Sequence, residues 1–569
     1  MKAIKNILSI CSVALLLGSC QADLLETKPY GNVAAGNMWT SENFADKGVT
    51  AIYSTLRKSY VGLGLYQMDC LGVSTDCRDA DYPIMRNTIT TSNGMFSSYW
   101  SEHYSGISRA NDAIVHLPEV DMPENKKARY MAEAKVLRAY FYYKLNIMYK
   151  GVPVYLEPVE ASECTKGQET EAAVWQVIED DLTAAINEPN LPNIYTEGSS
   201  DYGRVTKGLA YALRGKAYLY QKEYAKAAAD FEAVSQCGFG LFEGDYKQLF
   251  KEANEQSKEM IFSVQCIGLD GLGNDISFRY GTRSSFGSCW NTYLVNADFV
   301  ETYENADGSK FNWNDYIPGY NEMEPAARAV FFLRDGLTDA EKEAMKTAGA
   351  DMSKYLPEGN EARIKAAYAN RDPRLTASII TPYSTYDGAN GSNEYTYTLR
   401  WPFRAGDVSE PFDLKTDTNN RFYYLYRKFV AEGASEIPNR SYSPIDVPLI
   451  RYADILLNLA ECYNELNQED KAIACVNQVR ERAGAALLNS NDATTVKGQD
   501  DLRERIRNER RWEFNGEGVN FFDEMRWGTW KESRFFEGAG LKQMWGTLQY
   551  DYTSVSYTHL RAHETGAYL

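Results

Sequence analysis

The sequence predicts a mainly α-helical fold that is interrupted by one large loop-rich insertion. Apolar residues recur with the period of a helix over residues of about 40–237 and again over about 446–530. Between them, residues of about 238–445 are rich in Gly, Asn, Asp, Tyr and Pro, with short strand-like runs at 260–266 and 395–399. Because long ordered loops on a rigid frame often carry function, we expect the insertion to form the ligand face.

Four helices are expected in the first part of the chain, each marked by apolar residues three or four positions apart. Pro118 ends the second helix, and Gly151 with Pro153 ends the third. Helix by helix, the apolar positions are Val49, Ile52, Tyr53 and Leu56; Tyr104, Ile107, Ile114 and Leu117; Ala134, Leu137, Phe141, Leu145 and Met148; and Val174, Val177, Ile178, Leu182 and Ile186.

Two helical hairpins follow a tetratricopeptide-like spacing of small and aromatic residues. In the first, Gly215 and Tyr218 lie on one helix, and Ala227 and Phe231 lie on the next. In the second, the same positions are taken by Ala460, Tyr463, Ala472 and Val476. Because small side chains let two helices approach closely, we interpret these residues as scaffold and not as a site.

The first twenty residues have the features of a bacterial lipoprotein signal. Lys2 and Lys5 precede an apolar stretch over residues 10–17 that is too short to span a membrane. Leu17-Gly18-Ser19-Cys20 then resembles a lipobox, in which the cysteine becomes the lipidated first residue. We expect residues 1–19 to be a signal peptide and Cys20 to carry the lipid that holds the protein at a membrane. The alternative is an ordinary signal peptide that contains a cysteine.

The end of the chain differs from everything before it. Residues 555–565 have no apolar period and resemble the in-frame translation of a transposon-type sequencing adapter. We therefore interpret residues 555–569 as a sequencing-adapter artefact, which leaves residues 20–554 as one domain. A genuine disordered tail is the alternative.

The net charge and the aromatic content both bear on the kind of partner that the protein binds. The net charge is −18 and no block of Lys or Arg occurs, which disfavours nucleic acid because phosphate neutralisation needs a basic stripe. The chain has 41 Tyr against 23 Phe and 10 Trp. A tyrosine hydroxyl needs a polar partner, so this excess suits surfaces and grooves better than a dry core.

The sequence shows no pattern typical of a metal or nucleophile centre. None of the ten cysteines has CxxC spacing; Cys70 and Cys77 could form a local disulfide, and most others are expected to be buried thiols. There is no GxSxG, HExxH or P-loop motif, and only His103 and His116 precede the tail. We expect no cofactor, although Asp307-Gly308 and Asp387-Gly388 leave a structural calcium possible, with turn chemistry as the simpler explanation.

Motifs from both halves of the chain combine into one family pattern. They include Glu509-Arg510-Arg511-Trp512-Glu513-Phe514, Asn370-Arg371-Asp372-Pro373-Arg374-Leu375 and residues 24–29, 132–140, 151–153, 447–461, 476–484, 516–518 and 522–527. Together they resemble the SusD/RagB family of outer-membrane nutrient-binding lipoproteins of Bacteroidetes, over nearly all of residues 20–550. The family's usual closing segment is absent, and the segment 555–569 stands in its place.

The resemblance implies a SusD-like fold with tetratricopeptide-like helix pairs and an irregular, loop-built ligand face. It also implies glycan or other nutrient binding at the cell surface, and a SusC-like TonB-dependent transporter as partner. Most charged residues of the motifs alternate in sign along neighbouring helices, so we interpret them as ion-pair networks of the frame. They are Arg451, Glu461, Arg480, Arg482, Glu509, Arg510, Arg511, Glu513, Asp523 and Arg526.

A sugar site needs flat aromatic faces together with planar polar groups, and two segments supply that mixture. The first segment lies between two expected helices, where the family commonly places ligand contacts, and the second lies in the insertion. The candidate ligand residues are Arg78, Asp79, Asp81, Tyr82 and Asn87 in the first, and Tyr280, Arg283, Trp290 and Asn291 in the second. Weaker candidates are Trp313, Tyr316 and Tyr320, and Trp100 is expected in the core.

The sequence thus predicts a lipid-anchored outer-membrane protein that captures an oligosaccharide and delivers it to a SusC-like transporter, without catalysis. A surface glycoside hydrolase remains a competing interpretation, since two well-placed carboxylates suffice for that reaction. A peptide-binding uptake lipoprotein and a protein-interaction scaffold also remain open.

Overall fold

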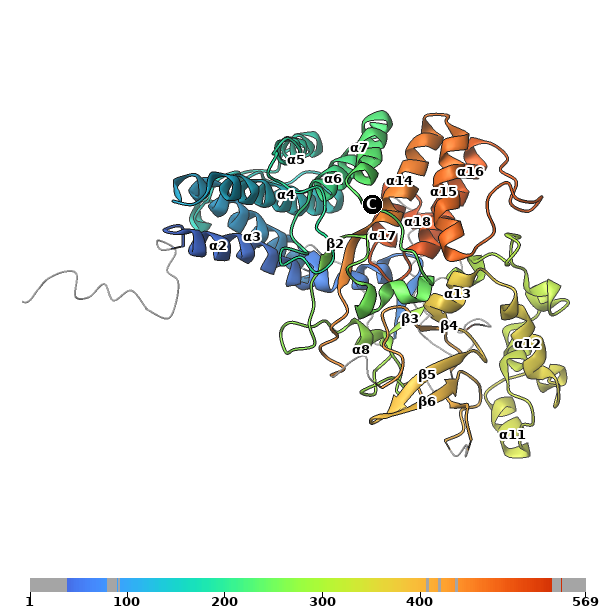
Figure 1. Ribbon diagram of the computed structural model, residues 1–569. Helices are drawn as coiled ribbons and strands as arrows, with labels where there is room; N and C mark the ends of the chain where they lie inside the picture. Colours follow the sequence, from blue (N-terminus) through green and yellow to red (C-terminus); the bar gives the residue numbers. More distant parts are fainter. Residues whose placement is uncertain are drawn as a thin grey trace, which may run out of the picture.

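The computed structural model describes residues 38–78, 90, 93–405, 409–417, 421–434, 439–534 and 544. It confirms a mainly α-helical fold with few and short strands (Figure 1). Residues 1–19, for which a signal peptide is expected, Cys20 and the segment 555–569 lie outside the described residues.

The four helices expected in the first part of the chain are present. Lys150 and Gly151, both with positive φ, end the third, and the side chain of Thr170 caps the fourth by accepting from Ala173 N. The helices of this part are α2 (Glu42–Ser54), α3 (Gly94–His116), α4 (Glu124–Tyr149), α5 (Glu171–Ile186), α6 (Lys207–Tyr220) and α7 (Tyr224–Gln236).

Both tetratricopeptide-like hairpins are confirmed as helix pairs, α6 with α7 and α14 with α15. In the first pair, a Cβ on Gly215 would lie 2.6 Å from the Phe231 ring, so only glycine permits this helix spacing. The two pairs also pack against each other through α7 and α14, which makes one continuous frame. The C-terminal helices are α14 (Tyr452–Glu465), α15 (Glu469–Ala483), α16 (Gln499–Glu513), α17 (Asn520–Trp527) and α18 (Trp530–Arg534).

The insertion contains more regular structure than the sequence predicts. Its short helices are α8 (Ile276–Tyr280), α9 (Ala297–Thr302), α10 (Pro325–Arg328), α11 (Asp339–Thr347), α12 (Asn360–Ala369) and α13 (Pro373–Ser378). The strands among the described residues are β1 (Thr75–Cys77), β2 (Met260–Val264), β3 (Tyr293–Val295), β4 (Ile379–Ile380), β5 (Thr385–Asn390), β6 (Asn393–Thr398), β7 (Phe412–Asp413), β8 (Leu425–Tyr426) and β9 (Val447–Arg451). Strands β2 and β6 confirm the two strand-like runs.

The strands form small separate sheets that tie distant segments together. Antiparallel pairs join β1 to β3, β2 to β9 and β4 to β8. The β5–β6 hairpin takes β7 as a parallel third strand and projects from the insertion at the lower part of Figure 1. The β2–β9 pair holds the start and the end of the insertion side by side against the helical frame.

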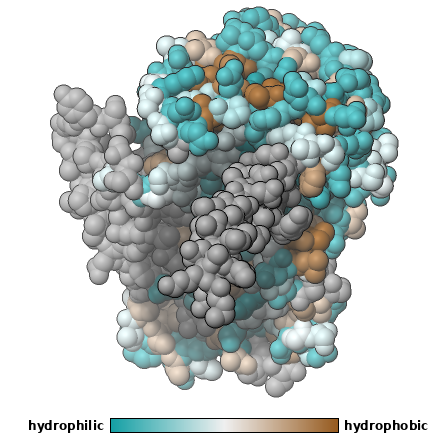
Figure 2. Space-filling model, turned by 90° about the vertical axis from the view of Figure 1, so that its left-hand side faces the viewer, coloured by the Kyte–Doolittle hydropathy of each residue, from teal (hydrophilic) through white to brown (hydrophobic). Residues whose placement is uncertain are grey.

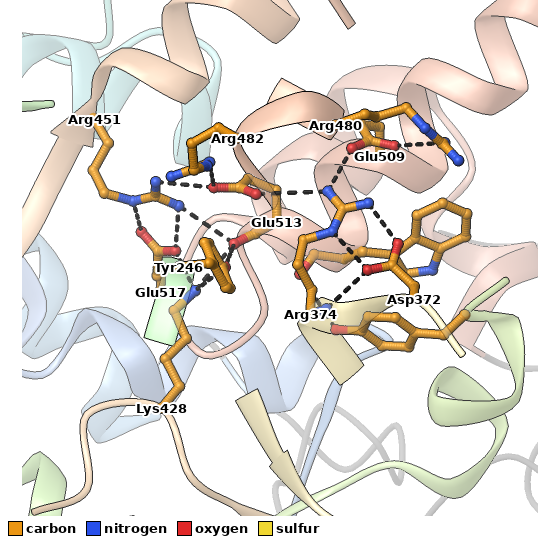
Figure 3. Close-up of polar contacts among 12 residues, drawn as sticks. Tyr246, Asp372, Arg374, Lys428, Arg451, Arg480, Arg482, Glu509, Glu513 and Glu517 are labelled. Atoms are coloured by element: carbon orange, nitrogen blue, oxygen red, sulfur yellow. Dashed lines mark hydrogen bonds and ion pairs between the residues drawn. The ribbon is translucent and has the colours of Figure 1, made fainter. Parts of the chain in front are cut away.

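A buried ion network confirms the structural interpretation of the charged motif residues (Figure 3). Glu513 accepts from Arg451 Nη1 at 3.0 Å and from Arg482 Nη2 at 2.5 Å, and Arg374 Nη1 lies 3.6 Å from its other oxygen. These side chains are at most 4% exposed. Further pairs are Arg451–Glu259, Arg480–Glu509, Arg510–Asp523, Arg511–Glu524 and Arg526–Glu461.

The network also joins the insertion to the frame, because two of its cations come from the insertion. Lys428 Nζ donates to Glu517 Oε1 at 2.5 Å and to the Glu513 carbonyl at 3.0 Å. Burial lowers the pKa of Lys428 to about 8 against the opposing effect of Glu517. Arg374, at the start of α13, pairs with Asp372 at 2.7 Å and with Glu509. The position of the insertion is therefore set by charge as well as by packing.

No helix in the described part of the chain is both long and apolar enough to cross a membrane. Figure 2 shows the side of the molecule that carries the N-terminal helices, where the coloured surface is mostly hydrophilic and the hydrophobic patches are small and separate. Such patches occur on ordinary protein surfaces and do not by themselves indicate an interface.

Three details of the sequence interpretation are corrected or refined. Asp307-Gly308 is a turn, in which Ser309 N donates to the Asp307 carboxylate at 2.9 Å. Asp387-Gly388, for which turn chemistry was the simpler explanation, lies within strand β5. Among the cysteines of the described residues, Cys164 is exposed, and the buried ones are Cys70, Cys77, Cys237, Cys266, Cys289, Cys462 and Cys475.

Candidate functional site

Strand pairing brings the two candidate ligand segments together. In the β1–β3 pair, Cys77 lies opposite Tyr293, and Arg78 N donates to the Thr292 carbonyl at 2.8 Å. Arg78 is thereby placed beside the loop that carries Arg283, Trp290 and Asn291. Asp79, Asp81, Tyr82 and Asn87, which continue the first segment, lie outside the described residues and stay predictions.

One carboxylate that the sequence did not reveal connects the candidate residues. Asp417 Oδ1 accepts from Arg283 Nε at 2.6 Å, and its Oδ2 lies 3.3 Å from Arg78 Nη1. The backbone N–H of Asp417 donates to Asn291 Oδ1 at 2.9 Å. Asn291 itself is fully buried and has a φ of 37°, so it orients this cluster from below and does not reach the surface.

Trp290 presents an aromatic face beside this cluster. Its side chain is 37% exposed and packs on Phe278, with the ring centroids 4.7 Å apart. The guanidinium groups of Arg283 and Arg440 lie 5.9 and 6.0 Å from the indole. Backbone bonds from Trp290 N to Phe278 O and from Asn291 N to Gly281 O hold the loop to the end of α8. The indole is therefore exposed on a well-supported loop.

A groove of about 850 Å³ continues from Arg283 toward the β5–β6 hairpin. Its floor and walls carry half-buried aromatic rings, among which Phe412 packs edge-on against Tyr395 at 5.6 Å. The rings that line the groove belong to Phe286, Tyr395, Tyr397, Phe403 and Phe412. Polar groups at the same surface come from Ser288, Asn390, Ser392 and Lys415.

The charged groups at one end of the groove are held in ion pairs. Asp413, which is 5% exposed, accepts from Arg334 Nη1 at 2.7 Å and also pairs with Arg400. Arg404 pairs with Glu341 at 2.7 Å, and this contact lowers the pKa of Glu341 to about 2. Glu341 is therefore ionised at neutral pH, which does not suit a general acid.

The structure also corrects several aromatic assignments. Tyr280 is fully buried, stacks on Tyr426 at 4.0 Å and donates to the Gly516 carbonyl, so it is a core residue and not a ligand contact. Trp313 and Tyr320 are likewise in the core, while Tyr316 is half-buried. Trp100, expected in the core, is 36% exposed on α3.

No histidine is among the residues that line the groove. His103 is fully buried, and desolvation lowers its pKa to about 3, so the ring is neutral at physiological pH. Within the described ranges, no group of three or more His, Cys, Asp or Glu is placed to hold a metal ion. What this surface can do chemically is stack flat apolar faces and form directional polar contacts.

The aromatic rings of the groove were missed by the sequence interpretation, although one signal was available. Tyr395 and Tyr397 alternate along β6, which places them on one face of the hairpin. Phe412 joins them only through the parallel β6–β7 pairing, which sets Phe412 opposite Tyr397. A pairing between separate segments has no local sequence signature, so Asp417 and Phe412 were not predictable from their neighbours.

Gly388 holds the hairpin against the loop that carries Arg283. A Cβ at this position would lie 2.2 Å from the Ser284 carbonyl and 2.8 Å from the Tyr397 ring. We expect Gly388→Val to lower the free energy of unfolding by about 2 kcal/mol through overpacking. Urea denaturation measures this change. Gly240→Val, at a glycine with nothing within 4 Å, is the control, and equal losses in both variants would contradict the contact.

Comparison with known proteins now identifies the family. Residues 258–565 match the SusD family, and residues 25–219 match a family described as "Starch-binding associating with outer membrane". The first match includes part of the segment 555–569 that the sequence interpretation excluded from the domain. A SusD-like protein of Formosa agariphila is 25% identical over 543 residues, which is 92% of each chain.

Solved structures show the same fold. A SusD-like carbohydrate binding protein from Bacteroides fragilis has a TM-score of 0.66 and 24% identity, covering 87% of this chain and 88% of that one. A laminarin binding SusD-like protein has a TM-score of 0.59 and 24% identity, covering 92% and 98% of the two chains. With more than half of its length matched to the family and the fold shared with these structures, the chain belongs to the SusD family.

Proposed function

We propose that this protein binds an oligosaccharide in the groove between Trp290 and the β5–β6 hairpin, and that it does not cleave it. The observation that carries the proposal is the groove itself, which is lined by five half-buried aromatic rings. The exposed Trp290 indole lies beside Arg283, one of the lining residues. Sugars present apolar ring faces with hydroxyl groups at their edges, and such a surface complements both. Arg283 and Asn390 supply the planar polar groups.

The relatives support the class of ligand. Two solved proteins of similar fold are named as a carbohydrate binding protein and a laminarin binding protein, and others are named surface glycan-binding proteins of Bacteroides fluxus and Bacteroides uniformis. These names describe binding and not catalysis. A glycoside hydrolase is the less favoured function, because Asp413 and Asp417 are both engaged by arginines.

The same family supports a proposal for the cellular role. The description of the family matched by residues 25–219 refers to the outer membrane. We propose that the lipid on Cys20 anchors the protein there with its groove at the cell surface, and that it passes its ligand to a SusC-like TonB-dependent transporter. Peptide capture is the second candidate ligand class for the same role. Neither cofactor nor metal takes part in the proposed binding.

Trp290→Ala tests the ligand assignment. We expect the dissociation constant for a polysaccharide that the parent protein binds to rise at least tenfold, because truncation removes an exposed stacking face. The hit comes from a glycan screen by affinity electrophoresis, and calorimetry measures its affinity. Trp100→Ala is a matched control, since that indole is also about one-third exposed but lies on α3 and packs against Tyr104 and Tyr149.

Full affinity in Trp290→Ala would remove this indole from the site. Separate incubation of the parent protein with the bound glycan tests catalysis, and any product that appears would reject the non-enzyme interpretation. A protein that binds none of the glycans but binds peptides would move the proposal to its second ligand class.

A further inference from the structure

A second cavity lies in the helical frame, apart from the groove. It has a volume of about 340 Å³ and lies between the segment 194–206, which leads into α6, and strand β2 with the residues before it. It shares no lining residue with the groove. Residues that line it and bear on its chemistry are Tyr195, Tyr202, Gln256, Ser257, Ser263 and Gln265.

Three lining residues have buried hydroxyl groups with no hydrogen-bond partner in the protein. They are Tyr195 Oη, Ser257 Oγ and Ser263 Oγ, and the Ser263 side chain belongs to a residue that is only 5% exposed. Buried hydroxyls without partners are uncommon in folded proteins, and each one costs stability. Three of them line one cavity, where the polar groups of a ligand would supply the missing hydrogen bonds.

Carboxamide groups add to this polar lining. Gln265 lies directly against the backbone of Gly203, since a Cβ there would be 2.8 Å from the side-chain Cδ. Gln256 is oriented by its own Oε1, which accepts from Gly198 N at 2.9 Å. A carboxamide both donates and accepts, which matches the hydroxyl groups of a polyol.

The walls are apolar, and the arginine among the lining residues is already paired. Phe239 and Phe262 line the cavity as buried aromatic side chains. Arg204 is engaged by Glu133 and by Asp46, both at 3.0 Å. Arg204 is therefore not available as a counter-charge for an anionic ligand.

Two further charged residues line the cavity, Glu197 and Lys258, and both are exposed. Their opposite charges favour neither an anionic nor a cationic ligand, whereas a neutral ligand meets hydroxyl, amide and aromatic groups.

The cavity is also preformed by regular structure. Strand β2 is held by its antiparallel pairing with β9, with Ser263 opposite Pro448. On the other side, the Thr206 side chain caps α6 by accepting from Leu209 N at 3.1 Å. A rigid cavity binds a small ligand with little ordering cost.

From these features, we propose that this cavity is a second binding site, specific for a compact neutral sugar of one or two rings. The volume suits a ligand of that size, and the partners offered are hydroxyls and amides, as for a polyol. The site is independent of the groove and extends the protein's recognition to a terminal or released sugar unit.

The test uses the full chain carrying Trp290→Ala, so that the groove is weakened first. Six probes are titrated by calorimetry: glucose, galactose, mannose, maltose, cellobiose and laminaribiose. We expect at least one to bind with one site per chain. Adding Ser257→Trp fills the cavity and should weaken that binding at least tenfold, while Ser353→Trp, an exposed serine far from the cavity in sequence, should not change it.

Ser263→Ala provides a milder second variant. It removes an unpartnered hydroxyl, so the thermal midpoint should not fall, while affinity for the bound probe should drop about fivefold through one lost hydrogen bond. Binding of none of the six probes, or unchanged binding in Ser257→Trp, overturns the proposal. If the parent protein still binds a polysaccharide in that case, the proposal of a ligand site in the groove stands. If the parent protein binds no polysaccharide while a probe binds the cavity, the groove proposal fails and the cavity proposal stands.

Discussion

Glu513→Gln is expected to lower the free energy of unfolding by about 3–5 kcal/mol, the typical cost of breaking a buried ion pair from one side. Glu513 lies among Arg451, Arg482 and Arg374, and it is fully buried (Figure 3). The glutamine keeps the size of the side chain but removes the charge. The three buried guanidinium groups would then have one carboxylate fewer to pair with, so part of the free-energy cost of their desolvation would no longer be offset.

The matched control lies on the same helix. Glu504 pairs with Arg507 at 2.6 Å, but its side chain is 57% exposed, so Glu504→Gln should cost less than about 1 kcal/mol. Denaturant unfolding at neutral pH compares the two variants. Similar losses in both would show that burial does not determine the strength of the network.

The same substitution should alter the response to acid. Burial alone would raise the pKa of Glu513, but Arg482, Arg451 and Arg374 outweigh it and lower the pKa to about 2. A lowered pKa gives stability that is present above the ordinary value near 4.5 and is lost as the pH falls toward 2. Glu513→Gln should therefore show a shallower decline in stability between pH 5 and about 2.

Gly518→Val is the second substitution with a large expected effect, a loss of about 3 kcal/mol or more. Gly518 has a φ of 72°, and a Cβ there would lie 2.3 Å from the Leu65 carbonyl oxygen. Its N–H donates to the buried Asp69 carboxylate at 2.9 Å. The substitution combines backbone strain with a clash against a main-chain atom that has no room to move.

Gly528→Val separates the two contributions. Gly528 has nearly the same φ, 73°, but nothing lies within 4 Å of its Cβ position, so this variant should show the strain alone. Urea unfolding of both variants measures the difference, and equal losses would show that the contact with Leu65 is unimportant. Because residues 65–71 lead directly into β1 and Arg78, Gly518→Val should also weaken ligand binding in the groove.

The sequence predicted the frame more fully than the site, because helices are encoded locally. The periodic helices and both hairpins were found from the spacing of residues such as Gly215 and Phe231. The alternating charges of α15 and α16 likewise predicted that Arg480 and Glu513 belong to the frame. Each of these inferences needed only neighbours along one or two helices.

The site depends on contacts between segments far apart in the chain, and there the prediction was partial. Arg78, Arg283 and Trp290 do lie together, as predicted. Asp417, which joins the two arginines, was missed because it follows a strand whose pairing cannot be predicted from the local sequence. Tyr280 shows the opposite failure. It lies in the expected segment, yet its helix turns the ring toward Tyr426 in the core.

The pairing of β2 with β9 has a consequence for how this protein can diversify. The strands that open and close the insertion run antiparallel, so the chain leaves the frame and returns to it at neighbouring points. Segments with adjacent ends can be exchanged or lengthened at little cost to the fold that receives them. Residues between 265 and 446 can thus be treated as a replaceable segment. Arg374 and Lys428 must be kept in it, because their ion pairs join the segment to the frame.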